Sequence, residues 1–154
     1  RPGDGFVLAI GIPGVRRQVT EPMLARGCRF LTLIHPTAIV MASAAIGVGS
    51  VICPYAIVSD ATKVGRFALL NYHSSLGHDA SVGDFAVLSP YATLGGAAVL
   101  GDDAFLGLHA SIGPNVVVGA RTFVSAGSIA LHDSEPDSLV YGVPGRASKY
   151  LGVG

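Results

Sequence analysis

The segment NYHSSLGHDASVGDFAVLSP, residues 71–90, places an amide, two imidazoles and two carboxylates within fourteen residues. A neutral imidazole can accept a proton near pH 7, and a neighbouring carboxylate can hold its tautomer. His78 and Asp79 therefore form a candidate general base with a supporting acid. Gly96, in TLGGAAVLG, follows His78 by eighteen residues and offers a backbone N–H without a side chain in the way, which could stabilise an oxyanion. This combination suits acyl transfer from a thioester to an amine or a hydroxyl group.

The elements that must position these residues are indicated by a repeat of six. Every sixth residue from Ile34 to Val124 is aliphatic, and the fifth position of each of these hexads is Ala, Ser or Thr except at Val116. The second position is Gly nine times. A period of six fits neither a helix nor simple alternation, but it fits a short strand followed by a turn. Three units would close one coil of eighteen residues, with the aliphatic residue inside, the small residue at the bend and Gly relieving the backbone at the corners.

The coil predicts which polar residues meet. Because Leu70 and Leu76 keep the core positions, the polar side chains between residues 71 and 79 should leave the prism at its walls and corners. A separation of eighteen residues places His78 at the same corner as Gly96, one strand spacing away.

A second column of residues is predicted at another corner. His73, Tyr91 and His109 are spaced by eighteen residues, so we expect a stacked surface ladder. His35, at the start of the first coil, and His132, after the last, are expected to be capping or surface residues.

The repeat over residues 34–129 resembles that of the left-handed β-helix acyltransferases. The fold class expected from this resemblance is all-β: a left-handed parallel β-helix of hexapeptide repeats with a short N-terminal α/β remnant and a C-terminal tail. Members of that family usually form trimers with active sites between neighbours, so the resemblance implies a homotrimer.

The segments outside the repeat indicate which family of β-helix acyltransferases the chain resembles. FVLAIG reads as a strand, residues 13–27 as a helix with a Pro start and a Gly stop, and CRFLTLIHP as a second strand. This partial βαβ unit, with its AIG and HPTA junctions, resembles the end of the nucleotide-sugar-binding subdomain of the sialic-acid O-acetyltransferase and bacillosamine-type N-acetyltransferase family. The expected organisation is a truncated subdomain at 1–33, the β-helix at 34–130 and a C-terminal extension at 131–154.

The resemblance also implies roles for individual residues. In that family an Asn seven residues before the base and a Gly eighteen after it are matched here without a gap. His78 would be the general base, Asp79 would tune it, and Gly96 would bind the acetyl carbonyl. Asn71 would help to place the sugar, with His73 a further candidate contact.

Coenzyme A contacts are expected from the same resemblance. GVPGR resembles the family's C-terminal motif, so that Arg146 and Lys149 could meet the phosphates of acetyl-coenzyme A, the implied co-substrate, and His109 is a further candidate contact. Val87 stands where some relatives carry a second His, and His109 where many carry Asn. The resemblance as a whole implies N-acetylation of a nucleotide-linked 4-amino sugar.

Other functions remain open at this stage. O-acetylation of a sugar such as sialic acid would use the same machinery. A γ-carbonic-anhydrase-like zinc protein would need three His, and the 36-residue spacing of His73 and His109 lacks its third ligand because that position is Pro114. A non-catalytic β-solenoid is the third alternative. We expect no metal site.

Composition excludes several partners. Ten basic and ten acidic residues cancel, so neither nucleic acid nor an anionic membrane is an expected partner. No apolar run reaches the roughly 18 residues of a spanning helix, and no signal peptide is visible. Cys28 and Cys53 show no disulfide or metal pattern and are expected to be reduced. A cytoplasmic location is the resulting expectation.

Overall fold

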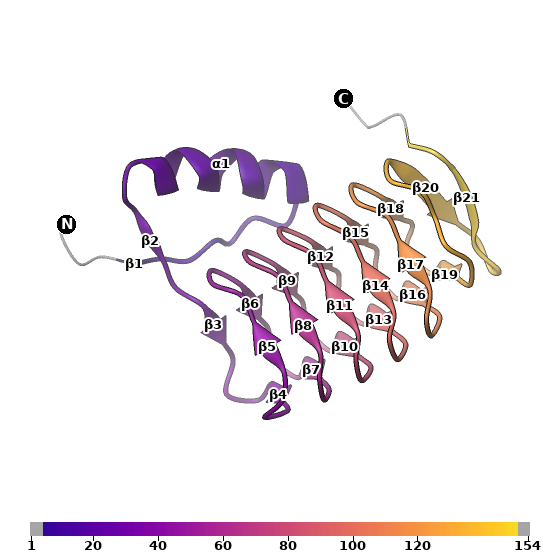
Figure 1. Cartoon of the computed structure of the whole chain (residues 1–154), viewed down its shortest axis with the longest axis horizontal. Helices are drawn as coiled ribbons and strands as arrows, with labels where there is room; N and C mark the ends of the chain where they lie inside the picture. Colours follow the sequence, from indigo (N-terminus) through magenta and orange to yellow (C-terminus); the bar gives the residue numbers. More distant parts are fainter. Residues whose placement is uncertain (1–4, 151–154) are drawn as a thin grey trace.

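The computed structural model describes residues 5–150, most of which form a three-sided parallel β-helix (Figure 1). Residues 1–4 and 151–154, at the two ends of the organisation expected above, lie outside the described residues. The fold matches a left-handed β-helix: the hexad pattern predicted the coils, and the family resemblance predicted their left hand.

Three parallel sheets form the sides of the prism. The eight-stranded sheet contains β3 (Leu33–Ile34), β6 (Val51–Ile52), β9 (Leu69–Leu70), β12 (Val87–Leu88), β15 (Phe105–Leu106), β18 (Phe123–Val124), β20 (Ser138–Tyr141) and β21 (Arg146–Lys149). The six-stranded sheet contains β4 (Ile39–Val40), β7 (Ile57–Val58), β10 (Ser75–Leu76), β13 (Thr93–Leu94), β16 (Ser111–Ile112) and β19 (Ile129–Ala130). The five-stranded sheet contains β5 (Ala45–Ile46), β8 (Lys63–Val64), β11 (Ser81–Val82), β14 (Val99–Leu100) and β17 (Val117–Val118).

The turns between the sheets form three corners. The first corner joins the eight-stranded to the six-stranded sheet, the second joins the six-stranded to the five-stranded sheet, and the third returns to the eight-stranded sheet. Successive coils pair in a register of eighteen residues, for example Ser75 with Thr93 and Thr93 with Ser111. This register confirms the predicted coil and places residues eighteen apart at the same corner.

The interior of the prism is a column of aliphatic and small side chains. The second residue of the middle strands is almost fully buried, from Ile52 to Val124, and the small residue before each strand is buried as well. Burial of this apolar surface is the main stabilising term, at roughly 25 cal/mol per Å². The prediction of which residues face inward is therefore confirmed.

The role expected for glycine at the corners was wrong. The left-handed backbone of each turn falls two residues after the position that is rich in Gly, and non-glycine residues occupy it in twelve successive turns from Tyr55 to Arg121. The glycines instead allow close stacking of the coils: a Cβ on Gly101 would lie 2.5 Å from the backbone nitrogen of Ala120, and one on Gly77 would lie 2.6 Å from that of Gly96. Most of these positions are thus restricted by contact with the next coil.

The N-terminal segment forms the predicted βαβ unit, with shorter strands. β1 (Gly5–Phe6) pairs in parallel with β2 (Arg29–Phe30), and α1 (Pro13–Ala25) lies between them in the sequence. Pro13 starts the helix, and Pro22 is accommodated within it. Figure 1 shows α1 lying along one edge of the β-helix.

The two ends of the prism differ. At the N-terminal end Leu33, Ile34 and Ile39 are exposed, although Ile34 is in a core position. At the C-terminal end β20 continues the parallel ladder from β18, and β21 then pairs with β20 in the antiparallel direction. Val140 of this hairpin is buried, so β20 and β21 cover the last coil.

Candidate active site

His78 and Asp79 form an exposed acid–base pair at the second corner, directly after β10. The Nδ1 atom of His78 lies 2.8 Å from Oδ2 of Asp79. A carboxylate holds the proton on Nδ1, which leaves the lone pair on Nε2 free to act as a base. Asp79 has a left-handed backbone, with φ of 59°, at the turn position where the fold requires it. The proximity of two residues adjacent in sequence could not be inferred from the hexad pattern.

Gly96 lies directly beside the imidazole of His78, as the coil arithmetic predicted. A Cβ at position 96 would lie 2.7 Å from Nε2 and 2.8 Å from Cε1 of His78. The ring therefore occupies the space that any side chain at position 96 would need. The carbonyl of His78 accepts a hydrogen bond of 2.8 Å from the amide of Ala97, which fixes the two coils relative to each other at this corner.

The amide of Gly96 is available as a hydrogen-bond donor. Among residues 5–150 it donates no hydrogen bond. At the third corner two of the equivalent amides are used, because Arg66 and Asp84 donate theirs to the Oδ1 atoms of Asp84 and Asp102 at 2.7 and 2.8 Å. The residue one coil beyond Gly96 is Pro114, whose side chain has no acceptor. A base and a free N–H donor thus meet at one corner, the arrangement that acyl transfer needs.

Asn71 lies at the first corner and not with His78. It directly follows β9, and β10 of the six-stranded sheet separates it from the second corner. Its Oδ1 accepts a hydrogen bond of 2.9 Å from the amide of Tyr72. The Nδ2 group remains as the donor that a ligand could use. Within one chain the structure does not bring Asn71 and His78 together.

The predicted histidine ladder is present at the first corner, and it is longer than predicted. Tyr55, His73, Tyr91 and His109 stack with centroid separations of 5.0, 4.8 and 4.8 Å and interplanar angles of 10°, 7° and 6°. All four side chains are exposed. Tyr55 was missed, although it precedes His73 by the same eighteen residues. His73 and His109 therefore contact tyrosine rings, and His35 and His132 are exposed at the two ends of the repeat.

Arg146 and Lys149 are exposed at opposite ends of β21. Arg146 pairs with Tyr141 and Lys149 with Ser138. Because side chains alternate along a strand, residues three apart point to opposite faces. The structure does not bring the two cations to one point.

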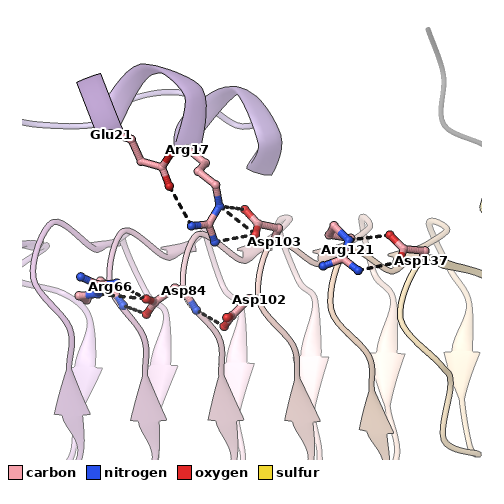
Figure 2. A network of polar contacts seen from close by, with 8 residues as sticks. All are labelled: Arg17, Glu21, Arg66, Asp84, Asp102, Asp103, Arg121 and Asp137. Atoms are coloured by element: carbon pink, nitrogen blue, oxygen red, sulfur yellow. Dashed lines mark hydrogen bonds and ion pairs between the residues drawn. The ribbon is translucent and has the colours of Figure 1, made fainter. Parts of the chain in front are cut away.

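The third corner carries a charged network that sequence reasoning missed (Figure 2). The Nε atom of Arg17 lies 3.0 Å from both carboxylate oxygens of Asp103, and its guanidinium also lies 4.3 Å from the centroid of the Phe85 ring. Hydrogen bonds to Asp103 raise the pKa of Arg17 despite partial burial. The sequence held one signal that α1 would pack at this corner. The residue with the left-handed backbone changes from Phe85 in one coil to Asp103 in the next.

Arg16 connects the helix to the prism through backbone carbonyls, and no carboxylate of residues 5–150 pairs with it. It is fully buried and donates to the carbonyl of Phe67 from Nη2 at 2.7 Å and from Nε at 3.1 Å. Its Nη1 donates to the carbonyls of Leu8 and Ile10. Burial lowers the pKa of Arg16 to about 10. This residue holds α1 and the segment after β1 on the β-helix.

Two features are absent from the part of the chain that the structure describes, a cluster of metal-binding residues and a membrane-spanning helix. Within residues 5–150 no group of three or more His, Cys, Asp or Glu residues is placed to hold a metal ion. The same residues contain no helix with the length and apolarity that a bilayer span requires.

Comparison with known proteins agrees with this geometry. No family model matches the chain. The perosamine N-acetyltransferase PerB of Caulobacter crescentus, solved with CoA and GDP-perosamine, superposes with a TM-score of 0.90 at 30% identity, covering 92% of this chain and 69% of that one. The acetyltransferase domain of PglB from Neisseria gonorrhoeae gives a TM-score of 0.88 at 32% identity, covering 92% and 69%.

A curated relative matches over a shorter segment. UDP-N-acetylbacillosamine N-acetyltransferase of Bacillus subtilis is 49% identical over 47 residues, which is 30% of this chain and 22% of the relative's length. The alignment thus spans less than a quarter of that relative.

The fold and the paired His78 and Gly96 define a left-handed β-helix acyltransferase. At 32% identity over two thirds of the PglB domain, the chain belongs to the family of CoA-dependent acetyltransferases that act on nucleotide-linked amino sugars.

Proposed function

We propose that the protein transfers the acetyl group of acetyl-CoA to the amino group of a nucleotide-linked 4-amino sugar. The observation that carries this proposal is the position of His78 Nε2 beside Gly96, whose amide has no acceptor among residues 5–150. The CoA and GDP-perosamine bound to PerB, and the acetyl-CoA bound to the PglB domain, support the two substrates.

In this mechanism Nε2 of His78 accepts the proton that the sugar amine loses as it attacks the thioester carbonyl. General base catalysis of this kind is worth about 10²–10⁴-fold. Gly96 N–H donates a hydrogen bond to the carbonyl oxygen as it gains negative charge, typically worth about 10²–10³-fold. Asp79 holds the imidazole in the required tautomer. A C–N bond forms, the C–S bond breaks, and His78 returns its proton to the leaving thiolate.

The test is release of CoA by the wild type and by His78→Asn with UDP-, GDP- and dTDP-linked 4-amino sugars and matched 4-hydroxy sugars. We expect turnover with a 4-amino sugar and a loss of at least about a hundredfold in the variant. Mass spectrometry of the product identifies the acetylated atom. Turnover that is unchanged in His78→Asn would overturn the assignment of the base, and turnover only with a hydroxyl acceptor would overturn N-acetylation.

We further propose that the active enzyme is a homotrimer. Asn71 and His78 leave one chain at different corners, so that the Asn71 of a neighbouring chain would meet His78 across a subunit interface. The exposure of the His78 and Asp79 side chains, 74% and 60%, supports a second wall over this corner. Light scattering after gel filtration should give three times the monomer mass, and an active monomer would contradict the proposal.

The proposed roles of the remaining predicted residues follow from their positions. Asn71 places the sugar through Nδ2, and Arg146 and Lys149 act singly on phosphates because they point to opposite faces of β21. We propose a cytoplasmic reaction, since Cys28 and Cys53 are free thiols of the kind that a reducing compartment maintains.

A further inference from the structure

Asp60 adds a carboxylate to the column of His78 and Gly96 at the second corner. It precedes His78 by eighteen residues, and the strands before these two residues, β7 and β10, pair in register. The carbonyl of Asp60 accepts a hydrogen bond of 2.9 Å from the amide of Asp79, so the two turns stack directly on each other. The backbone of Asp60 therefore lies one coil, about 4.8 Å, from that of the proposed base.

One oxygen of this carboxylate is used by the protein and the other is not. Ser43 Oγ in the preceding coil donates to Oδ1 of Asp60 at 2.8 Å, and it accepts a hydrogen bond of 3.0 Å from the amide of Ala61. Within residues 5–150 Oδ2 of Asp60 accepts no hydrogen bond and the exposed carboxylate forms no ion pair. Asp84, at the same hexad position of the third corner, instead pairs with Arg66 at 2.8 Å.

The side chains of Asp60 and His78 turn away from each other along the column. The imidazole lies next to Gly96, because a Cβ at that position would be 2.7 Å from Nε2. The carboxylate is bound to Ser43, which belongs to the coil on the other side of Asp60. The gap between Nε2 of His78 and Oδ2 of Asp60 therefore exceeds one strand spacing of about 4.8 Å. Two neighbouring groups of one ligand could bind across such a gap.

The two directions correspond to the two substrates. In the proposed mechanism the amide of Gly96 binds the thioester oxygen on the C-terminal side of His78. The acceptor sugar then occupies the N-terminal side of Nε2, where Oδ2 of Asp60 is open. Because both residues belong to one chain, a contact with Asp60 does not depend on a neighbouring subunit, as a contact with Asn71 would.

We propose that Oδ2 of Asp60 accepts a hydrogen bond from the 3-hydroxyl group of the acceptor sugar, next to the 4-amine that His78 deprotonates. The amine and the hydroxyl group lie on adjacent carbons, and a hydrogen bond of about 2.7–3.0 Å at each end lets them span more than one coil. Carboxylates accept strong hydrogen bonds from hydroxyl groups. This inference rests on the proposed function and makes Asp60 a specificity-determining residue for acceptors with a free 3-hydroxyl group.

Three variants separate this contact from a structural role. Asp60→Ala removes the carboxylate, and Ala42, one coil earlier in the same column, shows that alanine fits this position. Ser43→Ala removes the internal hydrogen bond to Oδ1 but keeps Oδ2. Asp102→Ala is the matched control, because it removes an exposed carboxylate from the same hexad position at the third corner.

The measurement is calorimetric binding of UDP-, GDP- and dTDP-linked 4-amino sugars and of their 3-deoxy analogues, with folding checked by circular dichroism. The wild type should bind the 3-hydroxy form of its sugar about tenfold or more tightly than the 3-deoxy form. Asp60→Ala should bind the two forms within about threefold of each other, while Ser43→Ala and Asp102→Ala keep the wild-type preference. The KM for acetyl-CoA should not change in Asp60→Ala.

A preference for the 3-hydroxy sugar that is equal in the wild type and Asp60→Ala overturns the inference, and so does its loss in Asp102→Ala. A wild type without any preference overturns it as well. Binding is measured without acetyl transfer, so the two proposals fail separately. A preference that depends on Asp60 in a protein that acetylates none of these sugars would overturn the proposed function and leave the contact with Asp60 standing.

Discussion

The second and third corners of the prism have the same backbone but opposite chemistry. At the third corner the amides of Arg66 and Asp84 are capped by the carboxylates of Asp84 and Asp102, and Asp103 is paired with Arg17 of the helix. At the second corner the amide of Gly96 has no acceptor within residues 5–150, and the imidazole of His78 is exposed above it. Where this turn position is not proline the backbone offers an N–H donor, and an aspartate one coil further on occupies that donor at Arg66 and Asp84 but not at Gly96, which is followed by Pro114.

Within the same repeat, the third corner therefore contributes to stability and the second corner carries the candidate active site. The third corner also holds α1 on the β-helix, through Arg16 and through the pair of Arg17 with Asp103. Figure 2 shows the Arg17 pair. The second corner retains the amide of Gly96, which can donate to a developing negative charge. The predictions below test whether the two corners can be perturbed independently.

The largest contrast is expected between Gly101→Ala and Gly96→Ala. A Cβ at Gly101 would lie 2.5 Å from the backbone nitrogen of Ala120, so the coils must separate, at a cost of about 2–3 kcal/mol in the free energy of unfolding. The three atoms nearest to a Cβ at Gly96 all belong to the movable ring of His78, so unfolding should change by less than about 0.5 kcal/mol. Activity should nevertheless fall about a hundredfold, because the base is displaced. Urea unfolding and CoA release check both, and equal destabilisation by the two changes would refute the contrast.

Asp79→Asn should lower kcat about tenfold without loss of stability. Asparagine fits this backbone, as Asn115 shows with φ of 60°, but its amide does not hold the proton on Nδ1 of His78 as a carboxylate does. The measurement is kcat against pH, with urea unfolding as the control. An unchanged kcat and pH profile would show that Asp79 does not orient the base.

Asp103→Asn should reduce stability by about 1 kcal/mol and loosen α1. The pair with Arg17 is partly buried, with side-chain exposures of 34% and 14%, which favours a measurable contribution over that of a fully exposed pair. Hydrogen exchange should increase in α1, while CoA release should be unchanged. A double-mutant cycle with Arg17→Ala isolates the pair, and additive effects of the two changes would show that it contributes nothing.

Arg66→Ala should give the smallest effect, about 0.5 kcal/mol at pH 7, because Arg66 is 58% exposed and the pair is screened by solvent. Partial burial raises the pKa of Asp84, but hydrogen bonds from Arg66 and its charge lower it overall. A carboxyl group with a lowered pKa in the folded state stabilises the protein above its ordinary pKa of about 3.9 and loses this contribution as pH falls through the folded value. Urea unfolding of both proteins at pH 7 and below pH 4 should show the difference shrinking on acidification. A difference that grows on acidification would reverse the assigned sign.

The sequence predicted most of the prism because one rule repeats without interruption. The core column, the outward polar residues, the stacking of His73, Tyr91 and His109, and the contact of His78 with Gly96 all follow from a period of eighteen. The helix contacts of Arg16 and Arg17 could not be predicted, since they depend on how α1 is placed against the coils. The closeness of His78 to Asp79 and the true role of the glycines required the turn geometry, which the spacing alone does not contain.

The hairpin of β20 and β21 has a consequence for growth of the column. A parallel coil offers the same edge at its end as at every earlier step, so a bare end is a template for another copy. β21 reverses the strand direction at the last step and runs antiparallel to β20. The last edge of the eight-stranded sheet therefore lacks the hydrogen-bonding pattern that a further parallel coil would continue. The hairpin thus opposes end-to-end association of β-helices.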